Sequence, residues 1–222
     1  MIKLKGKGAH GGVAVGRAVF LRRTDIRAER RSVADVEREI ERFRKAREQA
    51  AVELRELYKR ALSDIGQSGA QIFEIHEMML FDGDYEHSVE NTIRVENVNA
   101  EYAVSTSADH FAKIFSSMDD PYMSARAADI IDVSRRICRV LSGAGEMSIE
   151  GKGIIICADD LAPGETMQLD KSRISAFVTS EGSVNSHTAI LARTMGIPAV
   201  VGVGISTSLS LPFQLCRHSM CL

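Results

Sequence analysis

The spacing of apolar residues changes twice along this chain of 222 residues, and these changes constrain its fold. Residues 12–22 are patterned as a β-strand. Residues 32–142 instead carry apolar side chains three and four positions apart, which is typical of amphipathic helices. After Gly143, short apolar runs alternate with short helical stretches, which predicts a compact α/β unit. Because the first strand needs partners, we expect it to pair with the later sheet, with the helical block as an insertion.

Capping residues and helix breakers divide the helical block into antiparallel segments. Ser32 is expected to cap a long helix, and Gly66 to Gly69 interrupt it before a second helix over 70–82. One face of the long helix carries Val36, Ile40, Phe43, Ala50, Leu54, Leu57 and Ala61, and one face of the second carries Ile72, Ile75 and Met79. Further helices are predicted to begin at Asp84, after Asn99 and at Pro121, and to end before Asn97, near Met118 and near Leu141.

The predicted α/β unit contains strands at 152–158, 174–179 and 199–202, with a short helix opening at Pro163. Between the last two strands, Ser186 is a good N-cap and Gly196 a good stop signal. His187 therefore falls in the first turn of a helix, where free backbone N–H groups and the positive end of the helix dipole favour a phosphate. A neutral imidazole can also act as a nucleophile, although a lone histidine at a helix start is often only structural.

The bulk composition excludes several classes of protein. A net charge of -2 gives no indication of nucleic-acid binding, and no apolar run is long enough to span a membrane. The first residues lack the apolar core of a signal peptide. Four cysteines, Cys138, Cys157, Cys216 and Cys221, show no metal-ligand spacing, and we interpret them as reduced thiols of a cytoplasmic protein. We predict no metal site in this chain.

The residues from Gly182 to Arg193 resemble the phosphohistidine signature of the phosphoenolpyruvate-utilising enzymes. That family includes Enzyme I of the bacterial phosphotransferase system and pyruvate phosphate dikinase. One departure is visible, because the family usually has Gly-Gly where this chain has Gly182-Ser183. A serine does not tolerate a positive φ cheaply, so the loop is expected to be slightly altered.

The helical insertion makes the chain similar to the N-terminal half of Enzyme I. Four further segments carry the resemblance, which covers residues 6 to about 204: Gly11 to Gly16, Ile72 to Leu80, Arg126 to Asp129 and Leu161 to Thr166. It implies an α/β phosphohistidine swivel domain with an inserted all-α helical bundle subdomain. We assign 1–22 plus 143–205 to the α/β domain, 23–142 to the helical subdomain and 206–222 to an atypical tail.

The resemblance also implies roles for particular residues. His187 would carry the phosphoryl group, and Thr166 would supply a hydroxyl to the imidazole or its phosphate. The phosphate loop would comprise Gly182, Ser183, Ser186 and Thr188. In Enzyme I the inserted helices bind the small carrier HPr, and the corresponding surface here would comprise Glu74, His76, Met78, Met79, Asp82 and Arg126. Gln67 and Ser68 stand where family members often have acidic residues.

The expected function is that of the phosphoryl-carrier part of phosphoenolpyruvate-protein phosphotransferase, with transfer from His187 to a histidine of HPr. The C-terminal barrel that binds phosphoenolpyruvate and magnesium in full-length family members does not fit in this chain, so we expect no cofactor here. Two alternatives stay open: a truncated HPr-docking module without turnover, and the swivel domain of a pyruvate phosphate dikinase-like enzyme. The residues do not distinguish a sugar branch from a nitrogen-regulatory one.

Overall fold

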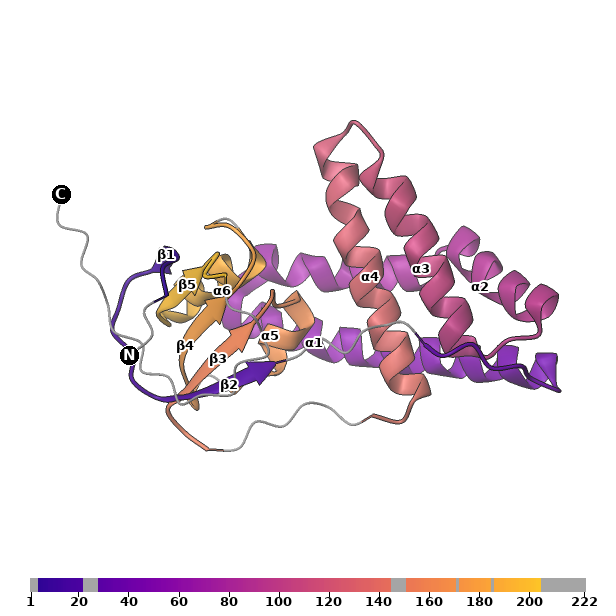
Figure 1. The fold of residues 1–222 in the computed structure, drawn as a ribbon, viewed down its shortest axis with the longest axis horizontal. Helices are drawn as coiled ribbons and strands as arrows, with labels where there is room; N and C mark the ends of the chain where they lie inside the picture. Colours follow the sequence, from indigo (N-terminus) through magenta and orange to yellow (C-terminus); the bar gives the residue numbers. More distant parts are fainter. Residues whose placement is uncertain (1–3, 22–27, 145–150, 171, 185, 205–222) are drawn as a thin grey trace. The chain divides into compact units, whose positions relative to one another are not determined.

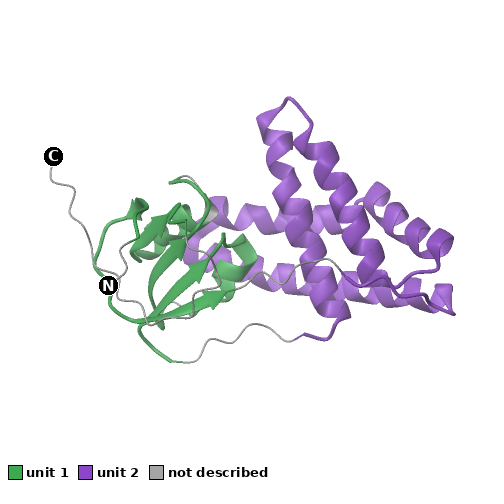
Figure 2. Ribbon diagram, viewed as in Figure 1, with its two compact units in different colours: residues 1–24, 147–222 green, residues 25–146 purple. Residues whose placement is uncertain are grey.

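The chain divides into two compact units, one formed by Met1–Thr24 with Met147–Leu222 and the other by Asp25–Glu146 (Figure 2). The computed structural model describes residues 4–21, 28–144, 151–170, 172–184 and 186–204. The first unit is α/β and the second is entirely helical apart from an isolated bridge. An α/β unit with an inserted helical unit is the fold class that the sequence predicts. The atypical tail predicted over 206–222 lies outside the described residues.

The α/β unit is built on a five-stranded sheet in the order β1-β5-β4-β3-β2 (Figure 1). Its strands are β1 (Lys7–His10), β2 (Arg17–Leu21), β3 (Ile154–Ala158), β4 (Ile174–Thr179) and β5 (Ala199–Val201). β1 runs antiparallel to β5, and the other neighbours are parallel. As predicted, the N-terminal segment pairs with the later strands.

The expected single strand over 12–22 is wrong in its extent, because two strands flank a connecting segment. β1 ends at His10 and β2 begins at Arg17, at opposite edges of the sheet. Gly12 lies between them with a φ of 156°, and a Cβ there would lie 2.4 Å from Pro198 Cγ. A side chain larger than that of glycine would therefore clash with Pro198 in this connection.

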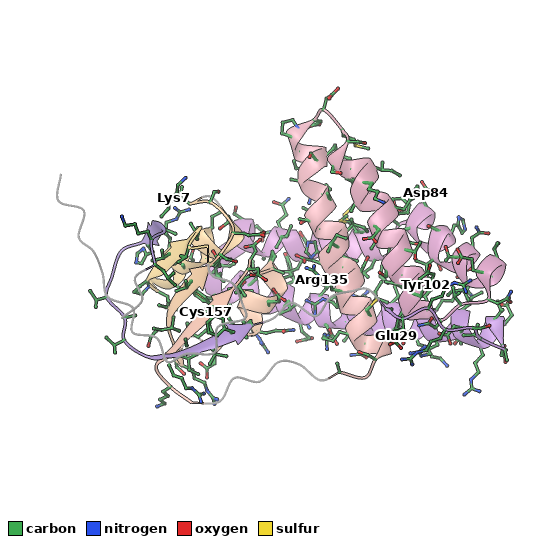
Figure 3. All side chains as sticks on the ribbon, in the orientation of Figure 1. Lys7, Glu29, Asp84, Tyr102, Arg135 and Cys157 are labelled. Carbon is green, nitrogen blue, oxygen red and sulfur yellow. The ribbon has the colours of Figure 1, made fainter. Side chains whose placement is uncertain are left out.

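Both faces of the sheet are buried, and one of them carries the two helices of this unit. All five residues of β3 are buried, and their side chains alternate between two apolar clusters. Ile154 and Ile156 share one cluster with Ala189 and Ala192 of α6 (His187–Met195), and Leu161 and Leu169, which flank α5 (Pro163–Gln168), belong to the same cluster. Cys157, labelled in Figure 3, belongs to the other cluster. The face that carries α5 and α6 therefore positions the candidate site.

The helical unit consists of α1 (Val36–Leu80), α2 (Gly83–Glu96), α3 (Ala100–Ser116) and α4 (Pro121–Leu141). The predicted break is confirmed within α1, where Gly66 has φ 78° and ψ 179° and separates two helical halves. Ser32 does not cap α1 as expected. Its backbone forms an isolated bridge with Val98, and the Asp35 side chain instead accepts a hydrogen bond from the N–H of Arg38.

The other helices begin close to the predicted positions. Asp82 caps α2 by accepting hydrogen bonds from the N–H groups of Asp84 and Tyr85, and Asp120 precedes Pro121 in the same role for α4. Asn99 stands before α3 as predicted, yet its side chain makes no cap hydrogen bond. Its Oδ1 accepts from the N–H of Arg31, which ties the segment before α1 to the start of α3.

The second half of α1 buries a different face from the one predicted. The buried residues are Ala70, Phe73, His76 and Leu80, whereas Ile72, Ile75 and Met79 are half-buried. The predicted face is offset by one position from the buried one, because apolar spacing alone gives no reason to place a histidine on the buried face. His76 is buried because it faces Asp129 of α4, a contact that no pattern within α1 indicates.

Candidate functional site

The carboxyl ends of β3 and β4 carry two loops that are held together by hydrogen bonds. The N–H of Ser180 donates to Ala158 O at 2.9 Å, and that of Glu181 donates to Asp159 O at 2.8 Å. The Ser180 hydroxyl donates to Asp159 Oδ1, also at 2.8 Å. These loops lead into α5 and α6, so both helices begin at the carboxyl end of the parallel strands β3 and β4.

His187 is the first residue of α6, as the sequence predicts. Ser186 caps the helix, with its Oγ 3.4 Å from the N–H nitrogen of Ala189. Gly196 ends the helix in the left-handed region with a φ of 67°. Because the first N–H groups of a helix have no intrahelical partner and lie at the positive end of its dipole, this position suits an anion.

The loop before α6 contains one glycine that its backbone requires. Gly182 has a φ of 91°, and a Cβ there would lie 3.3 Å from the Ser186 hydroxyl oxygen. Among the described residues, Asn97 is the non-glycine residue with a positive φ, so Ser183 keeps an ordinary backbone conformation. The substitution of serine for the family's second glycine therefore introduces no strain at Ser183.

Two threonines of the expected site are buried and donate to the same backbone segment. Thr166 is 2% exposed, and its hydroxyl lies 2.8 Å from Pro163 O and 3.2 Å from Ala162 O. Thr188 is 1% exposed, and its hydroxyl lies 3.4 Å from Leu161 O. Thr188 thus links the start of α6 to the loop before α5. The contact of Thr166 with the imidazole or its phosphate remains a prediction.

The expected partner surface combines exposed and buried residues of the helical unit. Met78 is 73% exposed, Glu74 and Asp82 are exposed, and Met79 is half-buried. His76 differs from the expectation, because it is only 4% exposed. Its imidazole therefore does not form part of the accessible surface, and any contribution to binding has to pass through its neighbours.

Arg126 and His76 meet at the carboxylate of Asp129. Arg126 Nη1 donates to Asp129 Oδ2 at 2.7 Å, and His76 Nε2 lies 3.3 Å from Asp129 Oδ1. Burial alone would raise the pKa of Asp129, but the neighbouring imidazole and guanidinium outweigh it and hold this pKa below its usual value. On its other side, Arg126 donates to the Tyr122 hydroxyl and lies over the ring, 4.5 Å from its centre.

Asp129 and Tyr122 are not among the residues predicted for the partner surface. A signal was present, since they stand three residues after and four residues before Arg126 on one predicted helix, where side chains are neighbours.

The described residues hold no group of three or more histidine, cysteine, aspartate or glutamate side chains that could bind a metal ion. Of the helices in the described part, none is both long and apolar enough to cross a membrane. Cys138 and Cys157 carry free thiols, and burial raises their pKa values to about 12 and about 11.

The sequence matches two family models of the PEP-utilising enzymes. The description "PEP-utilising enzyme, N-terminal" covers residues 5–126, and "PEP-utilising enzyme, mobile domain" covers residues 149–215. Phosphoenolpyruvate-protein phosphotransferase of Bacillus subtilis strain 168 is 38% identical over 209 residues, which cover 93% of this chain and 37% of that protein. The enzyme of Geobacillus stearothermophilus is 39% identical over 207 residues, or 92% and 36%.

Two solved structures share the fold. A solution structure of Enzyme I has a TM-score of 0.74 and 36% identity, covering 93% of this chain and 85% of that one. The N-terminal domain of the nitrogen Enzyme I has a TM-score of 0.69 and 28% identity, covering 93% and 86%. The chain spans little more than a third of the length of its curated relatives. It belongs to the PEP-utilising enzyme family, and the part it matches is the N-terminal portion of the phosphoenolpyruvate-protein phosphotransferases.

Proposed function

We propose that this chain carries a phosphoryl group on His187 and exchanges it with a histidine of HPr. The observation that carries the proposal is the position of His187 at the capped start of α6, in a chain that belongs to this family. The relatives named above favour Enzyme I over the dikinase-like alternative. The proposal retains the cytoplasmic location expected from the sequence.

The transfer itself is a displacement at phosphorus between two imidazoles. A lone pair on a ring nitrogen of His187 forms a new N–P bond as the N–P bond of phospho-HPr breaks, and the electron pair of that bond stays on the HPr imidazole. The reverse step returns the phosphoryl group. The reaction requires a neutral His187 imidazole, and catalysis consists mostly of positioning and charge stabilisation. N–H groups at the start of α6 are suited to stabilise the charge on the phosphoryl oxygens.

The packing of α6 supports the positioning role. Ala189 and Ala192 lie in the apolar cluster of the sheet, and the Thr188 hydroxyl donates to the loop before α5. The start of α6 is therefore anchored to the sheet by apolar packing and to the loop before α5 by a hydrogen bond. An anchored helix start reduces the entropic cost of bringing the two imidazoles together.

In the same proposal, the helical unit binds HPr through its exposed residues Glu74, Met78 and Asp82, together with Met79 and Arg126. Methionine side chains suit an adaptable apolar contact, and Arg126 supplies a positive charge. Phosphoenolpyruvate and magnesium are assigned to the C-terminal barrel of full-length family members. Exchange with phospho-HPr is therefore expected to need no metal bound to this chain.

The test uses the 222-residue chain with phosphoenolpyruvate, magnesium, HPr and a catalytic amount of full-length Enzyme I. Intact mass is expected to show one added phosphoryl group that is labile in acid and stable in base. The His187→Ala variant is the matched control and should gain none. Binding of HPr without any phosphoryl gain would contradict the carrier function and favour the docking-module alternative.

A further inference from the structure

Asp129 is a buried carboxylate of α4 that contacts Arg126 on its own helix and faces His76 on α1. It is 7% exposed, and its two oxygens serve different partners. Oδ2 accepts from Arg126 on the same helix, at 2.7 Å, and Oδ1 lies 3.3 Å from His76 Nε2 on α1. An unpaired carboxylate at such a depth would be costly, which favours keeping Asp129 together with its two partners.

Arg126 is held on a second side by Tyr122. Its guanidinium carbon lies 4.5 Å from the centre of the Tyr122 ring, and Nη2 donates to the hydroxyl. Tyr122 is 63% exposed and the Arg126 side chain is 13% exposed, so the clamp borders the surface with Tyr122 on its solvent side. A free arginine side chain loses rotamer freedom when a partner immobilises it, whereas one that is already held loses little. The cluster thus presents a pre-ordered guanidinium.

The guanidinium keeps hydrogen-bonding capacity for a partner. It has five N–H donors, and the two contacts above use one on each terminal nitrogen. A planar fork of donors matches a carboxylate or phosphate oxygen pair on the partner. His76 cannot make that contact itself because it is buried, but it faces the other oxygen of Asp129 and links that carboxylate to α1.

Resting on the function proposed above, we infer that Asp129 is a positioning residue of the HPr-binding surface that acts through Arg126. Its carboxylate orients the guanidinium toward an anionic or carbonyl acceptor on HPr, and His76 fixes the carboxylate in turn. Tyr122 completes the clamp from the solvent side. A purely structural role for Asp129 would change the stability of the helical unit without depending on Arg126 at the binding step.

A double-mutant cycle on HPr affinity separates these roles. The variants are Asp129→Asn, Arg126→Met and the double variant, and the dissociation constant for HPr is measured by titration calorimetry at fixed salt. Asp129→Asn is expected to weaken binding about three- to tenfold when Arg126 is present. In the Arg126→Met background, the same change should alter the dissociation constant less than about twofold. Equal losses in both backgrounds would overturn the inference.

Tyr122→Phe provides a second test at an exposed position, in case Asp129→Asn does not fold. It removes the hydroxyl that accepts from Arg126 and keeps the ring. Binding is expected to weaken about two- to threefold, again only when Arg126 is present. The KM for HPr in phosphoryl exchange should rise with little change in kcat, because docking rather than chemistry is affected. A loss confined to kcat would contradict a positioning role.

The unmodified chain separates a failure of the proposed function from a failure of the positioning role. If it neither binds HPr nor exchanges phosphate with phospho-HPr, the proposed function fails. If it does both, and a folded Asp129→Asn variant matches it, the positioning role alone fails.

Discussion

The Thr166 hydroxyl is already engaged by its own helix, and this limits what it can contribute to phosphoryl transfer. It lies 2.8 Å from Pro163 O and 3.2 Å from Ala162 O, and the side chain is 2% exposed. Because the hydroxyl has a single proton, it would have to give up these bonds in order to donate to the imidazole or its phosphate. Thr166→Val keeps the branched shape and removes only the hydroxyl, so it measures what the hydroxyl contributes to phosphoryl transfer.

The magnitude follows from the difference between two hydrogen bonds. A bond to a neutral carbonyl contributes about 0.5–1.5 kcal/mol and one to a charged group about 1.5–3 kcal/mol, so the net gain is about 1 kcal/mol. That gain corresponds to about a fivefold change in rate. We therefore expect Thr166→Val to slow exchange with phospho-HPr by no more than about fivefold and to lower the free energy of unfolding by about 1 kcal/mol.

The assay is a rapid-quench time course of phosphate exchange with purified phospho-HPr, followed by intact mass, alongside thermal unfolding. Thr194→Val is the matched control, because its hydroxyl makes a similar contact to Ile190 O at 3.0 Å on the exposed end of α6. It should leave the exchange rate unchanged. A fall of about a hundredfold or more for Thr166→Val at normal stability would refute the reasoning, since it would require about 2.7 kcal/mol from the transferred hydroxyl.

Three further predictions concern packing and pH. A Cβ on Gly16 would lie 1.9 Å from a backbone oxygen, so Gly16→Ala should destabilise the α/β unit by about 3 kcal/mol in thermal unfolding, whereas Gly8→Ala, with open space around it, should cost much less. Equal melting of the two variants would contradict the packing argument. The buried Tyr85 hydroxyl lies 2.7 Å from Ser134 Oγ, so Tyr85→Phe should cost about 1–3 kcal/mol in denaturant unfolding, and an unchanged midpoint would refute this. Folding lowers the pKa of Asp129, so its contribution to stability is complete above the pKa of the unfolded chain and is lost as pH falls through the lower folded pKa. In an acid titration, Asp129→Asn should therefore lose stability less steeply over that window than the unmodified chain does. Identical slopes would count against this expectation.

Local signals predicted the element boundaries that depend on a few neighbouring residues. Pro121 begins α4, Gly66 interrupts α1, and Ser186 with Gly196 bound α6. Each of these residues acts through its own backbone conformation or through a side chain that reaches the next turn. Such effects operate within four residues, so the sequence alone is sufficient to identify them.

Boundaries that depend on distant segments were not predictable in the same way. Asp35 rather than Ser32 caps α1, because the backbone of Ser32 pairs with Val98. The N-terminal segment likewise forms two strands because β1 pairs with β5 and β2 pairs with β3, at opposite edges of the sheet. In both cases, a residue far along the chain decided which of two locally acceptable structures forms.

The two parts of the candidate site also differ in whether neighbouring or distant residues determine their structure. By itself, the sequence determined that His187 begins a capped helix, because the cap, the helix formers and the stop signal all lie within one short segment. Only the tertiary structure decided that His76 is buried and that Asp129 joins it to Arg126. Helix packing brings those residues together from two separate helices, and the burial of a polar side chain depends on which partner the opposite helix supplies.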